Sequence, residues 1–138
     1  MDKFNKSHSD GAYALMRAEH LAVVTLCTIL AVWHFKDMNL WRFALIFLVI
    51  DVVGYLPGLI AYLRQGKGMI APIYHYLYNV THSYLTWGCI IFLWGQWLGW
   101  EWAMLAVPIH LSGDRGVFGN VFKPVSRLFE PTPRGNSN

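Results

Sequence analysis

The segment from residue 40 to residue 63, LWRFALIFLVIDVVGYLPGLIAYL, decides the fold class. It is apolar over the length of a bilayer core, which takes about 20 helical residues, yet it carries Asp51 near its middle. An ionisable group at such a position costs at least about 2.5 kcal/mol on insertion scales, so it usually faces the interior of a helix bundle. The segment therefore predicts a membrane helix with a polar inner face.

Three further apolar runs lie on either side of this segment, separated from it and from each other by short links. They are about Arg17 to Phe35, Met69 to Trp94, and the shorter Trp97 to Asp114. Short links make sequential helices antiparallel neighbours. We expect an all-α fold, an antiparallel four-helix transmembrane bundle over residues 17–123. A cytoplasmic N-terminal tail over 1–16 and a flexible C-terminal tail over 124–138 complete the expected organisation.

The composition excludes several classes of protein. Of 138 residues, 55% are hydrophobic and 14% are charged, whereas soluble domains carry about 25% charged residues. A soluble chain this short leaves too much surface in water to hide so many apolar side chains. Cys27 and Cys89 lie in apolar runs without a CxxC spacing, so neither a disulfide scaffold nor a zinc knuckle is indicated. No basic stripe alternates with aromatic residues, so we expect no nucleic-acid partner.

The basic residues orient the predicted bundle. Of the 11 lysines and arginines, all but Lys36 and Arg42 fall on the side that carries both termini. By the positive-inside rule, both termini lie in the cytoplasm and the protein belongs to the inner (cytoplasmic) membrane. A cluster of tryptophans at the opposite end is typical of an interfacial aromatic belt: Trp94, Trp97, Trp100 and Trp102.

Polar residues recur in the half of each run that this orientation places nearer the cytoplasm. The first run opens with Arg17-Ala-Glu19-His20, and the last ends with His110 one turn before Asp114. On the third run, spacings of i, i+3, i+4 and i+7 make one polar stripe of His75, Tyr78, Asn79 and His82. Such convergence predicts a shared polar centre rather than scattered surface groups.

We expect the residues of this centre to divide into two sets. The catalytic set faces a cavity open to the cytoplasmic leaflet and consists of Asp51, Tyr55, Asn79, His82 and His110. The substrate-binding set lines the mouth of that cavity and consists of Glu19, Tyr78, Asp114 and Arg115.

A carboxylate, a histidine and a tyrosine in a low-dielectric pocket are the parts of general acid–base catalysis. They predict a membrane-embedded enzyme of isomerase, cyclase or hydratase type. Its partners are then the lipid bilayer and a lipophilic small molecule, with a homo-oligomer left open. The alternatives are a non-catalytic small membrane subunit or carrier, whose polar core only fixes helix packing, and a metal- or haem-binding membrane protein.

We expect no cofactor and no metal. His75 and His82 are about 10 Å apart along one helix, too far to share an ion. Asp51 at mid-depth and the acids Glu19 and Asp114 nearer the interface spread the remaining ligands over several turns, which a tetrahedral metal does not tolerate.

Four short motifs follow one another along the chain. They are Arg17-x-Glu19, then Trp41-Arg-Phe43…Asp51…Gly54-Tyr55-Leu56…Gly58, then Tyr78-Asn79-x-x-His82-x-Tyr84, then His110-x-x-x-Asp114-Arg115…Gly119. Their order, over about Arg17 to Lys123, resembles a bacterial family of small four-helix integral membrane proteins of unknown function. That family often has Pro-Asp where this chain has Ile50-Asp51. The resemblance implies no reaction, but it implies a shared polar centre of Glu19, Asp51, Asn79, His82, His110 and Asp114.

Overall fold

The structure, a computed structural model, describes residues 10–130. Over that range the chain forms helices and no strand, which confirms the predicted all-helical class. The elements are α1 (Asp10–Trp33), the 3₁₀ turn η2 (Phe35–Asp37), α2 (Leu40–Gly54), α3 (Leu56–Arg64), α4 (Pro72–Thr81), α5 (Tyr84–Leu98), the 3₁₀ turn η3 (Trp102–Leu105), α6 (Ala106–Ser112) and the π-helical turn η4 (Gly113–Phe118).

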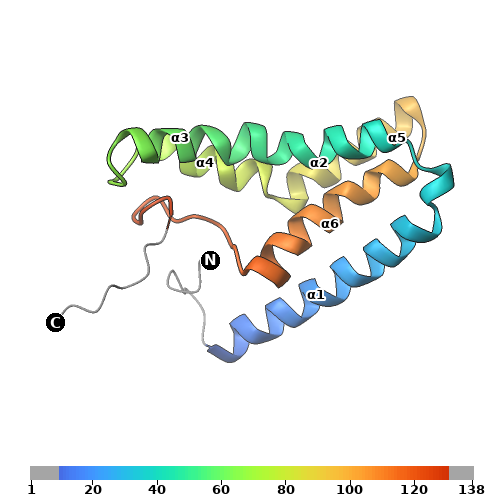
Figure 1. Cartoon of the computed structure of the whole chain (residues 1–138), viewed down its shortest axis with the longest axis horizontal. Coiled ribbons are helices and arrows are strands. Elements are labelled where there is room, and N and C mark those ends of the chain that lie inside the picture. Colours follow the sequence, from blue (N-terminus) through green and yellow to red (C-terminus); the bar gives the residue numbers. More distant parts are fainter. Residues whose placement is uncertain (1–9, 131–138) are drawn as a thin grey trace.

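The helices lie along the long axis of the molecule (Figure 1). Helix α1 leads from one end to the other, α2 and α3 return as one rod, α4 and α5 lead out again beside them, and α6 with η4 returns. Helix α6 lies between α1 and the other helices, and it packs against both α1 and α2. This central position makes α6 and η4 the element that joins the two sides of the fold.

Two of the predicted helices are interrupted. The rod bends little at Tyr55, whose backbone N–H still bonds Asp51 (2.9 Å), so α2 and α3 remain nearly continuous despite Pro57. The third run, by contrast, is divided between Thr81 and Tyr84, because His82 leaves helical geometry and the Ser83 side chain caps α5 by accepting from Leu85 N–H. A serine cap of this kind starts a new helix, so the third run, expected as one helix, is two helices with His82 in the turn between them.

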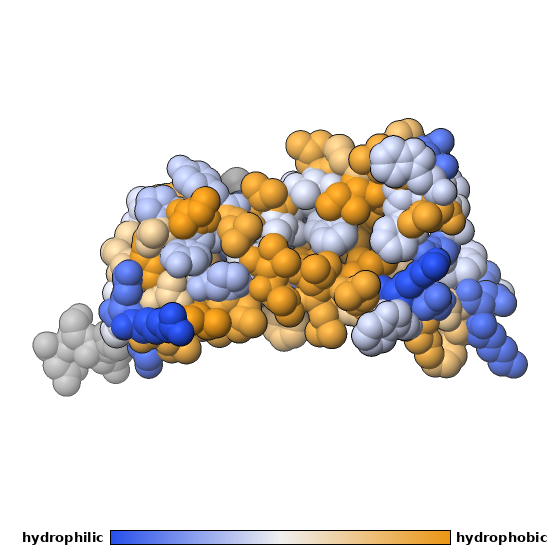
Figure 2. Space-filling model, turned by 90° about the horizontal axis from the view of Figure 1, so that it is seen from above, coloured by the Kyte–Doolittle hydropathy of each residue, from blue (hydrophilic) through white to orange (hydrophobic). Residues whose placement is uncertain are grey.

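In the described range, two helical stretches are long and apolar enough to cross a membrane, Gly11–Trp33 and Leu40–Arg64. On the face seen in Figure 2, hydrophobic residues gather in the middle and the most hydrophilic ones lie at the two ends. Large apolar side chains such as Leu26 and Leu48 are exposed along the helices. The surface therefore carries an apolar band, as contact with lipid requires.

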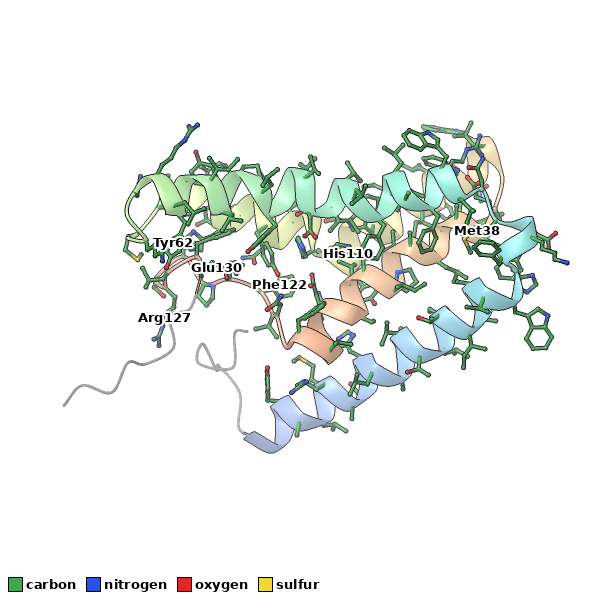
Figure 3. The ribbon with its side chains drawn as sticks, in the orientation of Figure 1. Met38, Tyr62, His110, Phe122, Arg127 and Glu130 are labelled. Atoms are coloured by element: carbon green, nitrogen blue, oxygen red, sulfur yellow. The ribbon has the colours of Figure 1, made fainter. Side chains whose placement is uncertain are left out.

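Both ends of the helical core differ from the prediction. Helix α1 begins at Asp10 rather than at Arg17. The segment after η4, expected to be flexible from residue 124, folds back beneath α3 and α4 as far as Glu130 (Figure 3). Phe129 is fully buried there, with its ring 5.9 Å from that of Tyr55. Burial of an aromatic side chain holds this segment on the helices, and only 131–138 of the expected tail lie outside the described residues.

Replacing Phe129 by alanine should reveal this segment as part of the fold. Phe129 has no exposed surface, and removing such a ring costs about 3–5 kcal/mol through lost contacts and a residual cavity. The matched control is Phe118→Ala, since Phe118 is 61% exposed and its loss should change stability by about 0.5 kcal/mol or less. Denaturant unfolding of the detergent-solubilised protein measures both, and equal effects would contradict a packed C-terminal segment.

Candidate functional site

Two histidines and two aspartates from different elements meet at one point. They are Asp51 on α2, His82 between α4 and α5, His110 on α6 and Asp114 on η4, hereafter the quartet. One side-chain nitrogen or oxygen of each lies within 4.8 Å of those of the other three. His82 Nε2 is 3.2 Å from Asp51 Oδ1 and 3.4 Å from Asp114 Oδ2, and His110 Nε2 is 3.5 Å and 3.7 Å from the same two atoms.

The quartet is buried midway along the molecule. His110 lies between the end marked by Tyr62 and the end marked by Met38 (Figure 3). The side chains of His82 and His110 are 5% and 4% exposed and that of Asp114 is 18% exposed, whereas that of Asp51 is 50% exposed. The site is therefore shielded from the exterior at His82, His110 and Asp114, and the Asp51 carboxylate is its exposed group.

A glycine lets these helices approach closely enough to form the quartet. Gly54 is the last residue of α2 and is buried, and Tyr55 follows it as the link to α3. A Cβ atom there would overlap the side chain of Thr81 and would lie 3.2 Å from Cε1 of His82. On the other side, a spacing of four residues puts His110 and Asp114 on one face of the α6–η4 helix. Backbone packing thus sets the spacing of the quartet before any side chain adjusts.

The tautomer of His82 follows from its neighbours. Its Nδ1 lies 3.0 Å from the carbonyl oxygen of Tyr78 and 3.2 Å from Thr81 Oγ1. The Thr81 hydroxyl donates its own hydrogen to the carbonyl oxygens of Leu77 and Tyr78, so it accepts from the imidazole. Nδ1 therefore carries a hydrogen, and Nε2 faces the two carboxylates, 3.2 Å from Asp51 Oδ1.

His110 is held by packing rather than by hydrogen bonds. Its ring stands edge-on to Phe47 with 4.6 Å between centroids. Among the described residues, neither of its ring nitrogens has a hydrogen-bond partner although both are buried. Buried polar atoms without a partner are rare in folded proteins, and here Nε2 faces the carboxylates of Asp51 and Asp114.

Two of the expected substrate-binding residues form the wall of the site. The Tyr78 ring stacks on that of His82 with centroids 3.9 Å apart. Arg115 donates to the backbone carbonyl of His82 (2.9 Å) and lies over the ring of Tyr84. A cavity beside His82 and Asp114 has room for about one water molecule.

The structure does not bring the other three expected residues to the quartet. The Asn79 amide instead holds the C-terminal segment, donating to the Lys123 carbonyl (3.0 Å) and accepting from its N–H (2.7 Å). The Tyr55 ring packs against Tyr78 and Phe129. Glu19 is exposed on α1. Tyr55 and Asn79 serve the return of the chain after η4, which spacing along one helix does not indicate.

Other neighbours of the quartet were not among the expected site residues. Phe47 lies one turn before Asp51, so the helical period places both on one face, but an aromatic ring in an apolar run carries no chemical signal. Ser112 is fully buried and joins α1 to α5, since its hydroxyl contacts Nδ1 of His20 (3.1 Å) and the hydroxyl of Tyr84.

No family model, curated protein or solved structure matches this chain.

Replacing Gly54 by alanine should disturb the quartet. The added methyl group meets Thr81 and the His82 ring, and overpacking of this kind costs about 1–3 kcal/mol. Gly88→Ala is the matched control, because a Cβ on this glycine of α5 has nothing within 4 Å and helical alanine is more stable than glycine. Unfolding free energies in detergent measure both variants, and a neutral Gly54→Ala would mean that α2 and α4 are not closely packed.

Proposed function

We propose that this chain is a membrane-embedded enzyme that acts on a lipophilic substrate at the quartet. The observation that carries the proposal is the meeting of two imidazoles and two carboxylates, from three separate parts of the chain, midway along a molecule that has apolar residues in the middle of its surface and hydrophilic ones at its ends. Ionisable groups are costly at that depth, and such groups in membrane proteins commonly mark substrate or ion sites. Membership of the bacterial family of small four-helix membrane proteins, which the four sequence motifs resemble, is part of this proposal.

The proposed setting is a transmembrane bundle with both termini in the cytoplasm. The positions of the links support it, because the link after α3, which carries Lys67, and η2, which carries Lys36, lie at opposite ends of the molecule. Both α1 and the α2–α3 rod have the length of a membrane span. Helices α4–α5 and η3–α6 complete the four crossings in this proposal, each as a broken helix whose irregular part is covered by protein, as membranes require.

The proposed chemistry is proton transfer. Asp51 is the most exposed member of the quartet and is therefore the group that a substrate meets. His82 and His110 lie within 3.5 Å of its carboxylate oxygen. Placing a proton on one carbon of an unsaturated lipid and removing one from another is the common requirement of isomerisation and cyclisation, and hydration needs the same groups to activate water.

An apolar cavity between α2 and α5 supports a lipophilic substrate. It has a volume of about 260 Å³, with Val49 and Trp87 in its wall. The Trp87 indole donates to the carbonyl of Thr81 (2.6 Å), the residue before His82. Trp87 thus links the wall of the cavity to the chain that carries His82, and this cavity is the proposed place for the hydrocarbon part of the substrate.

A second candidate is a non-catalytic membrane subunit or carrier. The contacts of the quartet join α2 to α6 and to the turn between α4 and α5, and polar contacts between membrane helices also serve as glue. In that case the quartet stabilises the fold and transforms nothing.

Lipid extracts distinguish the two candidates. Cells producing the wild-type chain should contain a lipid product that falls by at least about 100-fold with Asp51→Asn, the usual effect of losing an acid–base group. Asp37→Asn is the control, since Asp37 is an exposed aspartate at the end of the molecule away from the site. Failure of Asp51→Asn to accumulate would favour the structural role, and an unchanged lipid profile with normal accumulation would exclude catalysis by Asp51.

Cysteine labelling tests the proposed topology. In a chain with Cys27→Ala and Cys89→Ala, a cysteine at position 36 should react with a membrane-impermeant maleimide in intact cells. One at position 65 should react only after the cells are opened. Both Lys36 and Gln65 are exposed in links between helices, so accessibility depends on the side of the membrane alone. The reverse pattern would invert the topology.

A further inference from the structure

We infer that the quartet binds one divalent transition-metal ion, with Zn²⁺ the best match to its ligands. The inference deepens the proposed function and rests on it for the use of the ion, whereas binding itself is tested without a substrate. It replaces the expectation of a metal-free site.

The first argument is geometric. A tetrahedral ion with bonds of about 2.0–2.1 Å separates its ligand atoms by about 3.3–3.4 Å. The four imidazole–carboxylate distances of the quartet, 3.2, 3.4, 3.5 and 3.7 Å, lie close to that edge length. They are long for charge-assisted hydrogen bonds, which measure about 2.7–2.9 Å. Four of the six edges of such a tetrahedron are thus matched, and the remaining two pairs of ligand atoms lie within 4.8 Å.

The second argument concerns hydrogens. Since Nδ1 of His82 donates to the Tyr78 carbonyl, the neutral form of His82 presents the lone pair of Nε2 to two carboxylates. Lone pair against carboxylate is repulsive unless a cation or a proton lies between them. The arrangement is the usual one for a metal-binding histidine, whose other nitrogen donates to a carbonyl or carboxylate that fixes the ring.

The third argument concerns His110. A proton on His82 would satisfy the carboxylates around that ring, but Nε2 of His110 would still lack a partner. One dication meets all four side chains at once. Its charge also balances the site, because two neutral imidazoles and two carboxylates carry −2. A neutral assembly is far less costly to bury among apolar helices than an unpaired charge.

The expectation of no metal rested on two points, that His75 and His82 are too far apart to share an ion and that the acids lie at different depths. His75 does lie outside the site, where its Nε2 contacts the Arg127 carbonyl (3.1 Å). The second point is overturned, because Asp51 and Asp114 approach the same two imidazoles. The four ligands come from α2, from the turn at His82 and from the α6–η4 helix.

A bound ion would act as a Lewis acid, and a water molecule that took a fifth position on it would have a lowered pKa. The water-sized cavity beside His82 and Asp114 is the place for that molecule. Asp51 is the ligand open to the exterior, so it is the one that a substrate can displace.

Cobalt titration tests the inference. The full-length chain, purified in detergent and stripped with a chelator, should bind one Co²⁺ per chain. The visible absorption of four-coordinate Co²⁺ should appear and should be displaced by Zn²⁺. His110→Gln and Asp51→Asn should each weaken binding by at least about tenfold. His34→Gln should bind as the wild type does, because His34 stacks on Trp102 (3.6 Å) away from the quartet.

The inference can still be tested if the ligand variants fail to fold, because the wild-type chain gives an independent readout. Zn²⁺ should raise its melting temperature and a chelator should lower it, since an ion that binds only the folded state stabilises that state. A folded wild-type chain that takes up neither ion would overturn the inference. Undiminished Co²⁺ binding in folded Asp51→Asn and His110→Gln would do the same.

The two proposals fail separately. If the chain binds one ion but Asp51→Asn leaves the lipid profile unchanged, the metal site is supported and the proposed enzyme is contradicted. If the chain binds no Co²⁺ and lipid turnover continues after complete removal of metal, the enzyme is supported and the metal site is contradicted.

Discussion

Two carboxylates placed among apolar helices are the constraint on which the rest of this structure depends. Each is expensive there unless it is matched by a partner, and the partners are two imidazoles that reach the same point from the turn at His82 and from α6. The close approach at Gly54, the break in the third run and the central position of α6 together bring these four side chains to one point. The site and the packing are therefore one arrangement and cannot be altered independently.

Much of this arrangement could be predicted from the sequence because it is encoded in hydropathy and helical spacing. An aspartate in the middle of an apolar run is costly against lipid, so the sequence predicts that Asp51 faces the interior of the helix bundle. His110 and Asp114 share a face by their spacing of four residues. The helical class and the pairing of Asp51 with a histidine required nothing more.

The remainder could not be predicted, because it depends on contacts that one-dimensional patterns do not contain. Ser83 is a small polar residue in an apolar run, and nothing in hydropathy shows that it caps a new helix and leaves His82 in a turn. The spacing on the third run places Asn79 one turn from His75 and near His82, yet its partner is the backbone of Lys123, and no helical spacing relates these two residues. The segment that carries Lys123 is held on the helices by the buried ring of Phe129 together with hydrogen bonds from Asn79 and Tyr62.

Gly54 and Gly58 form a GxxxG pattern within an apolar rod, which in membrane helices commonly marks the face used for dimerisation. In this chain the pattern is occupied from within. Thr81 covers the first glycine and the Phe129 ring covers the second, so the backbone approach that would elsewhere join two chains joins two parts of one. Self-association must therefore use another surface, and α1, whose Leu15, Leu26 and Val32 are exposed, offers the longest uncovered apolar face.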